Sequence, residues 1–437
     1  MSRLRGVPVP RTRVLIRKTF DRCGPGRSLL ADPALTRRPP SRCNLPLEES
    51  EGACRPDRSH WRVTLSRSLR TPLCERLKID FPIFSAGMGP IAGPELVAAV
   101  SNAGGLGVLG CTSMSPEQVR AVIRRTRELT DRPFGVDLIL PARIEQDGTK
   151  VSDVAEQIPI GHRETAARIA TELGVEQSGG SASRGTGRNA LGTDAEAQVQ
   201  VVLEEGVPVF VGALGSPGSV VDRFHEAGAV VMSVVGNTKQ AVSVVRDGAD
   251  VVIAQGTEGG GHTGHVGTLA LLPQVLDAVE VPVVAAGGIG DGRGLAAALV
   301  MGCEAVWVGT RFLATEEAGI AGWQKAGLVA AADQSPVISR AYTGKRFRLL
   351  PNQWTEAWEA ADLDPLPMPL QPVLTELTIG PWATDRGGKE GISMNGAGNI
   401  VGLVKDVMPA AEVVRQMVAD ATARLDGFRP PGTPPPT

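Results

Sequence analysis

The sequence lacks the long hydrophobic segments of a membrane protein. No apolar run in its 437 residues approaches the length needed to cross a bilayer, and the N-terminus has no contiguous apolar region of a secretory signal. Apolar residues make up 42% of the chain, and the mean hydropathy is +0.00. We therefore expect a soluble globular protein in the cytoplasm, with no membrane partner.

Cysteines are few, and their spacing does not fit a metal site. There is no Cys-x-x-Cys pair and no Cys/His cluster at metal-ligand spacing. We expect no bound metal, and reduced thiols are the expected state of the cysteines. The six cysteines are Cys23, Cys43, Cys54, Cys74, Cys111 and Cys303.

Lysine is scarce beside arginine, and the excess of basic residues lies at the N-terminus. Residues 1–68 hold fourteen Arg and one Lys against six acidic residues, so the rest of the chain has a net charge of −11. An acidic body argues against a nucleic-acid partner.

Residues 1–68 are rich in Arg, Pro and Ser without a helical or strand period, which predicts a disordered extension. It could be a basic interaction tail, an organellar transit peptide, or sequence upstream of the true start codon. The abrupt start of the globular pattern at Leu69 favours the last of these interpretations.

From Phe81 onward, short apolar runs alternate with turns and amphipathic helical stretches. Runs that are apolar throughout indicate strands buried on both faces of a parallel sheet. Eight such units favour a closed (β/α)8 TIM barrel over residues 69–320. The expected strands are 82–85, 106–109, 134–140, 207–211, 229–234, 250–254, 281–285 and 305–308.

Helices are expected between these strands. Pro94–Asn102 ends at a glycine pair, and Ser115 and Pro116 form an N-cap and first-turn pair. The other expected helices are 217–227, 238–247, 271–279 and 292–301.

Two regions do not fit the repeating barrel unit. Residues 141–206 are too long for one connection and include a Gly/Ser-rich stretch at 178–192, so we interpret them as an insertion at the catalytic rim. It could serve as a lid, as a contact in a homo-oligomer, or as a plain surface excursion. Residues 321–426 are expected to form a C-terminal cover and a final helix from Ala410, and 427–437 a disordered tail.

Glycine-rich loops follow each of the expected strands six, seven and eight. In such barrels, functional groups lie on loops at the carboxyl ends of strands, and the loops after strands seven and eight commonly bind phosphate. Ala286–Gly292 and Gly309–Thr310 occupy these two places. Plain turns would also explain the glycines, but their joint placement favours a phosphorylated cofactor or substrate.

The loop after the sixth strand, Gly256–Gly267, adds two histidines to its glycines. Glycines allow the backbone to approach a flat or anionic ligand, and a histidine can take or give a proton near neutral pH. A flexible connection with a solvated histidine is the simpler interpretation of this loop alone. A fourth loop after the first strand, Ser85–Pro90, places small residues and Met88 where a planar ring could lie.

Six segments in this order resemble the nitronate monooxygenase family, formerly called 2-nitropropane dioxygenases. They are Pro82–Gly89, Val100–Gly107, Asp131–Val136, Glu258–His262, Ala286–Arg293 and Gly309–Leu313. The resemblance runs from about residue 70 to 425. It implies a flavin enzyme with FMN, in which a nitronate or nitroalkane is oxidised by O2 to a carbonyl compound and nitrite.

The resemblance also implies roles for individual residues. Gly87, Met88 and Gly89 would lie at the flavin ring with Gly261 nearby, and His262 would be the general base or the partner of the nitronate anion. His265 is taken as secondary. Ala286, Gly287, Gly288, Gly309 and Thr310 would hold the phosphate.

Two positions depart from the family pattern. Asp137 stands on the third strand where members often have Asn, which alters an expected contact with the flavin polar edge or with substrate. The fifth strand offers Met232–Val235 where some members have a lysine. Direct stabilisation of a reduced anionic flavin by such a lysine is therefore not expected.

Other functions remain open at this point. A flavin-dependent enoyl-acyl-carrier-protein reductase shares the barrel and a similar Gly-Gly-His loop, and would use NAD(P)H. Nucleotide dehydrogenases with a comparable phosphate site need a nucleophilic cysteine in the sixth loop, and this loop has none. A non-enzymatic flavin- or phosphate-binding barrel is the third alternative.

Overall fold

The computed structural model describes residues 69–140, 151–175, 195–383 and 389–427. The expected N-terminal extension, the whole Gly/Ser-rich stretch and nearly all of the C-terminal tail lie outside these residues. Among the described helices, none is both long enough and apolar enough to cross a membrane.

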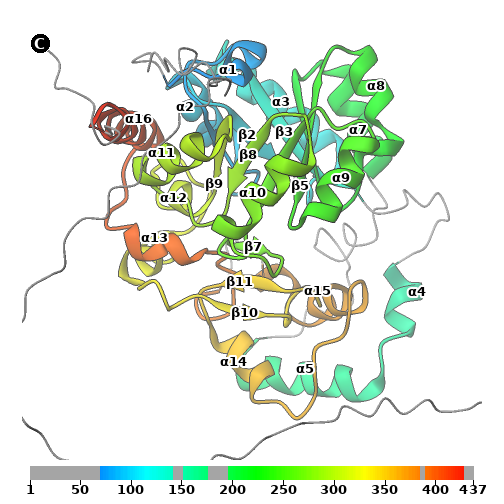
Figure 1. Cartoon of the computed structure of the whole chain (residues 1–437). Coiled ribbons are helices and arrows are strands. Elements are labelled where there is room, and N and C mark those ends of the chain that lie inside the picture. Colours follow the sequence, from blue (N-terminus) through cyan, green and yellow to red (C-terminus); the bar gives the residue numbers. More distant parts are fainter. Residues whose placement is uncertain (1–68, 141–150, 176–194, 384–388, 428–437) are drawn as a thin grey trace, which may run out of the picture. The chain divides into compact units, whose positions relative to one another are not determined.

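Eight parallel strands form a barrel, as the sequence predicts. Their spatial order is β1-β9-β8-β6-β5-β4-β3-β2, and a parallel bridge from Phe84 to Leu106 brings β1 back to β2. Figure 1 shows the strands with helices around them. The barrel strands are β1 Ile83–Ser85, β2 Gly107–Gly110, β3 Phe134–Ile139, β4 Val209–Ala213, β5 Val230–Val235, β6 Val251–Gln255, β8 Val283–Ala286 and β9 Ala305–Val308.

Alternating residues of each strand enter different cores, because successive side chains point to opposite faces. Phe84, Met232 and Ile253 pack together in one buried cluster that also includes α1 (Pro72–Leu77). Their neighbours in sequence, such as Ile83 and Val252, belong to a second cluster with the surrounding helices. Burial on both faces explains why these strands have apolar runs throughout.

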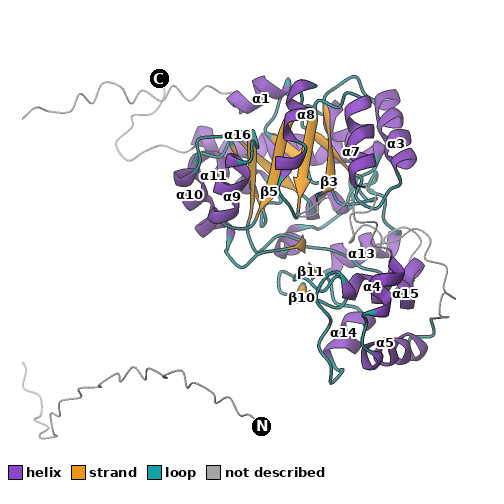
Figure 2. Cartoon of the chain, turned by 90° about the vertical axis from the view of Figure 1, so that its right-hand side faces the viewer, coloured by secondary structure: helices purple, strands orange, loops and turns teal. Residues whose placement is uncertain are grey.

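Helices connect the barrel strands (Figure 2). Ser115 caps α3 with a reciprocal bond to Gln118, and the side chain of Asp291 caps α11. The connecting helices are α2 Pro94–Asn102, α3 Pro116–Leu129, α7 Ala195–Glu204, α8 Val221–Glu226 after the 3-10 turn η2 Pro217–Ser219, α9 Thr238–Arg246, α10 Thr268–Ala278, α11 Gly292–Met301 and α12 Thr310–Leu313.

One helix begins earlier than the sequence pattern predicts. α10 starts at Thr268 and not at Leu271, because the carboxylate of Glu258 accepts hydrogen bonds from the backbone N–H and the hydroxyl of Thr268. A carboxylate at a helix N-terminus satisfies free N–H groups and favours the helix dipole. The cap comes from ten residues upstream, so local propensity does not reveal it.

The long segment between β3 and β4 divides into two parts. Its last helix, α7, packs on α3 and β3 as a barrel helix. Its first helices, α4 (Val151–Glu156) and α5 (Ile160–Glu172), pack against α15 (Leu370–Ala383), and α5 also contacts α14 (Gln353–Glu359). These four helices share a separate hydrophobic cluster that includes the buried Trp354 and Trp358.

The C-terminal region contacts the barrel in two further ways. α16 (Ala410–Gly427) packs on α11 and α2, while α13 (Gly322–Ala330) contacts the 3-10 turn η3 (Asn399–Leu403). A small antiparallel sheet joins β10 (Val337–Ser339) and β11 (Phe347–Leu349) to β7 (Gly261–His262). Through β7, the loop after β6 is paired to residues nearly ninety positions later.

The contact between β2 and α2 gives a test of this packing. A Cβ at Gly107 would overlap the carbonyl oxygen of Val97 in α2 and lie 2.7 Å from its carbonyl carbon. We expect Gly107→Ala to lower the free energy of unfolding by about 1–3 kcal/mol or more, since backbone must move. Chemical denaturation of the purified protein measures this change.

Gly327 in α13 is the matched control. A Cβ there meets nothing within 4 Å. Gly327→Ala should therefore stabilise the protein by about 0.5–1 kcal/mol through helix propensity. Equal effects of the two substitutions would contradict the close packing of β2 on α2.

Candidate active site

A cavity of about 1290 Å³ opens at the carboxyl ends of the barrel strands. This exceeds the range of about 300–1,000 Å³ that holds one drug-sized ligand. The cavity is therefore large enough for a cofactor together with a substrate. Of the residues proposed from the sequence, those lining it are Gly87, Met88, Gly89, Asp137, Gly261, His262, His265, Gly287, Gly288, Gly309 and Thr310.

Ala286 is the proposed site residue that does not line the cavity. It is fully buried at the end of β8, and its carbonyl oxygen accepts a hydrogen bond from the backbone N–H of Gly256. This hydrogen bond therefore links the loop after β6 to the end of β8.

The loop after β1 lies against the end of β3. A Cβ at Gly87 would overlap the carboxylate of Asp137, so glycine is needed here to make room for that side chain. Gly89 has φ of +56°, and a Cβ there would meet nothing within 4 Å. The loop thus leaves open space on its cavity side, bordered by Met88, whose sulfur would be 3.6 Å from a Cβ at Gly309.

The loops after β8 and β9 form a second glycine wall. Gly287 and Gly288 have φ of +85° and +73°, a conformation that favours glycine. Gly309 precedes the short helix α12, and the hydroxyl of its first residue, Thr310, accepts a bond from the backbone N–H of Gly398 at 2.9 Å. Backbone turns of this kind present N–H groups to an anion.

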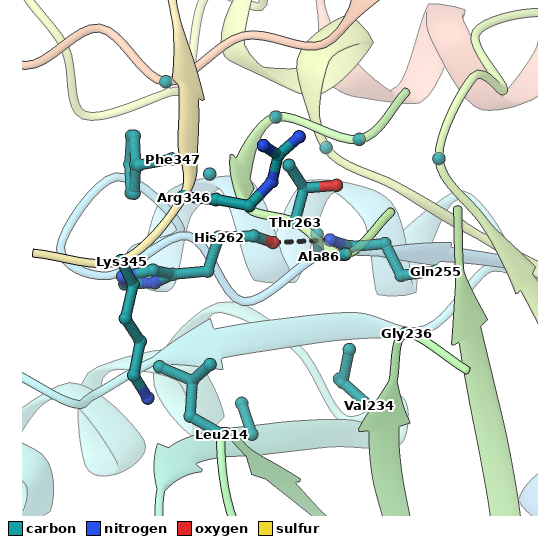
Figure 3. Close-up of a pocket in the computed structure, with 18 of the residues that line it drawn as sticks. Ala86, Leu214, Val234, Gly236, Gln255, His262, Thr263, Lys345, Arg346 and Phe347 are labelled. Carbon is teal, nitrogen blue, oxygen red and sulfur yellow. Dashed lines mark hydrogen bonds between the residues drawn. The ribbon is translucent and has the colours of Figure 1, made fainter. Parts of the chain in front are cut away.

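His262 is fixed from three sides. Its carbonyl oxygen accepts a hydrogen bond from Gln255 at 2.7 Å, drawn in Figure 3. Its Nε2 lies 3.1 Å from the hydroxyl of Thr343, and its ring meets the edge of Phe347 at a centroid distance of 5.1 Å. Gly261, with φ of +76°, allows the chain to turn into this position.

The environment keeps the imidazole of His262 neutral. Burial, and to a smaller extent the positive charge of Lys345, together lower the pKa of His262 to about 4. The ring is therefore an uncharged hydrogen-bonding group at pH 7, with one nitrogen able to accept a proton.

Asp137, within β3, is the opposite case. It is 8% exposed, and burial raises its pKa to about 8. Its Oδ1 is buried without a hydrogen-bond partner among the residues that the structure describes. A buried polar atom without a partner is costly, which suggests that a ligand completes its hydrogen bonding.

A group of cavity residues from the C-terminal region was not found from the sequence. Thr343, Lys345, Arg346 and Phe347 line the cavity from the segment that ends in β11. Figure 3 shows Lys345 and Arg346 on either side of His262. Local pattern could not place them, because only the pairing of β11 with β7 brings them here. The cations at 345, 346 and 348 were the one available signal.

Other titratable residues contribute less to the cavity. His265 is exposed and also lines the cavity. The described cysteines, Cys74, Cys111 and Cys303, are buried and outside the cavity lining, and burial raises the pKa of each. None of these three is positioned as a nucleophile.

The cavity fits a planar cofactor with an anionic tail. Glycines of the loop after β1 and of the loops after β8 and β9 line the cavity, and Gly89 has open space where a Cβ would lie. The unpartnered oxygen of Asp137 adds a polar group deep in the wall. Comparison with known proteins gives the decisive observation: the family description "Nitronate monooxygenase" matches residues 70–420.

The chain belongs to the nitronate monooxygenase family. It is 36% identical to a Mycobacterium tuberculosis protein over 82% of this chain and 99% of that protein. That protein is named as a monooxygenase, and its name states no substrate. It is 32% identical to an octahydro-indene carboxyl-CoA dehydrogenase of Rhodococcus jostii, over 83% of this chain and 98% of that protein. The solved nitroalkane oxidase of Streptomyces ansochromogenes matches with a TM-score of 0.70 and 30% identity, over 82% and 99%.

Membership of the nitronate monooxygenase family makes this chain a flavin-dependent oxidoreductase. The named relatives act on different substrates according to their names. The family therefore establishes the kind of enzyme, while the substrate must be argued from the cavity.

The influence of Lys345 on His262 can be tested directly. We expect the NMR titration of the His262 ring to have its midpoint near pH 4 and to move upward in Lys345→Met, because a nearby positive charge no longer opposes protonation. The shift should be only partial, since burial is the larger cause.

Two variants complete this experiment. His262→Asn identifies the resonance among the five histidines of the chain. Lys239→Met removes an exposed lysine of α9 outside the cavity lining and should leave the midpoint unchanged. A His262 midpoint near the ordinary value of about 6.5 would contradict the buried, cation-flanked site.

Proposed function

We propose that this enzyme binds FMN and oxidises alkyl nitronates with O2 to carbonyl compounds and nitrite. The observation that carries the proposal is His262, a neutral imidazole held at a cavity that glycine loops also line. Catalysis in the cytoplasm, by a homo-oligomer, is compatible with this proposal.

The described residues offer a place for each part of FMN. Gly287, Gly288, Gly309 and Thr310 would hold the phosphate, supported from below by Ala286. Gly87, Met88, Gly89 and Gly261 would border the ring, with Asp137 at its polar edge. When bound, FMN supplies the electron acceptor and the means of reaction with O2.

His262 has two functions in this proposal. For a nitroalkane it is the general base that removes the Cα proton, and for a nitronate it is a hydrogen-bonding partner of the anion. A base is most effective when its pKa is near the working pH. Because the pKa of His262 is lowered to about 4, the site suits a preformed nitronate better than a neutral nitroalkane.

Positive charge at the site comes from the β10–β11 segment. The residues of β5 that the family resemblance compares with a lysine are apolar or uncharged here, and Val234 lines the cavity. Arg340, Lys345 and Arg346 line it from the other side. These cations attract an anionic substrate such as a nitronate.

The same cations and the size of the cavity favour a second candidate, oxidoreduction of an acyl thioester. A carboxyl-CoA dehydrogenase is among the relatives, and a phosphate-bearing carrier would interact with a basic rim. The flavin-dependent enoyl-acyl-carrier-protein reductase raised by the sequence is the NAD(P)H-using form of this candidate.

Nitrite formation tests the first proposal. The purified protein should be yellow, release FMN on denaturation and form nitrite from alkyl nitronates in air. We expect His262→Asn to lower kcat/KM for a nitroalkane by about 10²–10⁴-fold, the usual contribution of a general base. The loss with a preformed nitronate should be smaller, since no proton has to be removed.

His225→Gln is the matched histidine control. His225 is exposed on α8 and pairs with Asp250 outside the cavity lining, so its removal should leave both rates unchanged. Rapid anaerobic bleaching of the flavin by NADPH, without nitrite formation, would favour the acyl thioester candidate. A colourless protein that cannot take up FMN would refute both.

A further inference from the structure

Asp137 is a buried carboxyl group in the cavity wall whose Oδ1 has no partner among the described residues. It lies in the middle of the barrel wall, where β3 pairs with Gly110 of β2 and Val211 of β4. The absence of a Cβ at Gly87 leaves space that the carboxyl group occupies. The fold thus makes room for a carboxyl group without giving it a partner.

Among the described residues, no cation contributes to the pKa shift of Asp137. On its own strand and on β4, the neighbours are apolar: Val136, Leu138 and Val211 are fully buried. The loop after β1 contributes Gly87, and the loop after β2 contributes Cys111, a titratable group whose own pKa is raised by burial and by Asp137. Burial raises the pKa of Asp137 to about 8.

A neutral carboxyl group has a useful pattern of hydrogen bonding. It presents one O–H donor beside one carbonyl acceptor, whereas an ionised carboxylate only accepts. A primary amide presents the same donor and acceptor pair. The imide edge of a flavin ring has one N–H between two carbonyl groups, so it is complementary to a neutral acid or to an amide, and only partly to a carboxylate.

We propose that Asp137 is a positioning residue that holds the flavin ring as a protonated acid, with the donor and acceptor pair that an asparagine would offer. This inference rests on the proposed binding of FMN. It makes retention of the cofactor dependent on the protonation of this carboxyl group.

The proposal predicts a pH dependence with a definite sign. Above the pKa of the empty site, FMN must bind together with a proton, so its dissociation constant rises with pH. For a group with a pKa of about 8, the dissociation constant should increase about tenfold between pH 7 and pH 9. The phosphate of FMN stays dianionic over this window, since its second pKa is about 6.

The test measures FMN affinity by quenching of flavin fluorescence on adding the apoprotein, from pH 7 to pH 9. We expect the wild type to weaken about tenfold, and Asp137→Asn to match the wild type at pH 7 and to change less than about twofold. Asp277→Asn, an exposed acid on α10, is the control and should keep the wild-type slope.

Thermal unfolding of the apoprotein supplies a second measurement. Because the folded pKa of Asp137 is raised above its unfolded value, its contribution to stability is lost as pH rises from about 4 to about 8. The Tm of Asp137→Asn should therefore exceed that of the wild type by a margin that grows over this range.

The outcomes separate this role from the proposed function. A wild type that binds FMN with the same pH slope as Asp137→Asn overturns the role of Asp137 alone. FMN binding that tightens as pH rises from 7 to 9 in the wild type alone would mean that a carboxylate is the binding form, and also overturns it. Failure of every variant to bind FMN overturns both proposals.

Discussion

The pairing of β7 with β11 is the interaction on which the catalytic side of the cavity depends. Gly261 and His262 come from the glycine-rich loop after β6, and a glycine-rich segment alone has little reason to hold one conformation. The register of His262 with Phe347 supplies main-chain hydrogen bonds and an aromatic edge against the imidazole. The position of the candidate base therefore depends on β11, which follows the barrel strands in the sequence.

The barrel could be predicted because its signals are local. Each strand is an apolar run. Short sequence patterns also predict where helices begin and end, such as Ser115-Pro116 at the start of α3 and Gly292–Met301 for α11. The glycine loops also follow from order along the chain, since carboxyl ends of parallel strands meet at one rim. This was enough to place every proposed residue except Ala286 on the lining of one cavity.

The rest of the site depends on contacts between distant residues. Thr343, Lys345 and Phe347 belong to a segment without strong local pattern, and they reach the cavity only through β11. The start of α10 depends on Glu258 ten residues earlier. The raised pKa of Asp137 depends on its burial by β2, β4 and the loop after β1. The residues next to Asp137 in the sequence do not predict this burial.

Burial shifts the pKa values of His262 and Asp137, two of the titratable groups that line the cavity, in opposite directions, and both groups become uncharged as a result. It lowers the pKa of His262 to about 4 and raises that of Asp137 to about 8, so both are uncharged between these values. The field that a substrate meets from this part of the lining then comes mainly from Lys345 and Arg346, and it is positive. An anion drawn in by that field would offset the effect of Lys345 on His262 and raise the pKa of the imidazole. Only an anion has this effect, so it would strengthen the hydrogen bond of the imidazole to a nitronate and would not assist proton removal from a neutral nitroalkane.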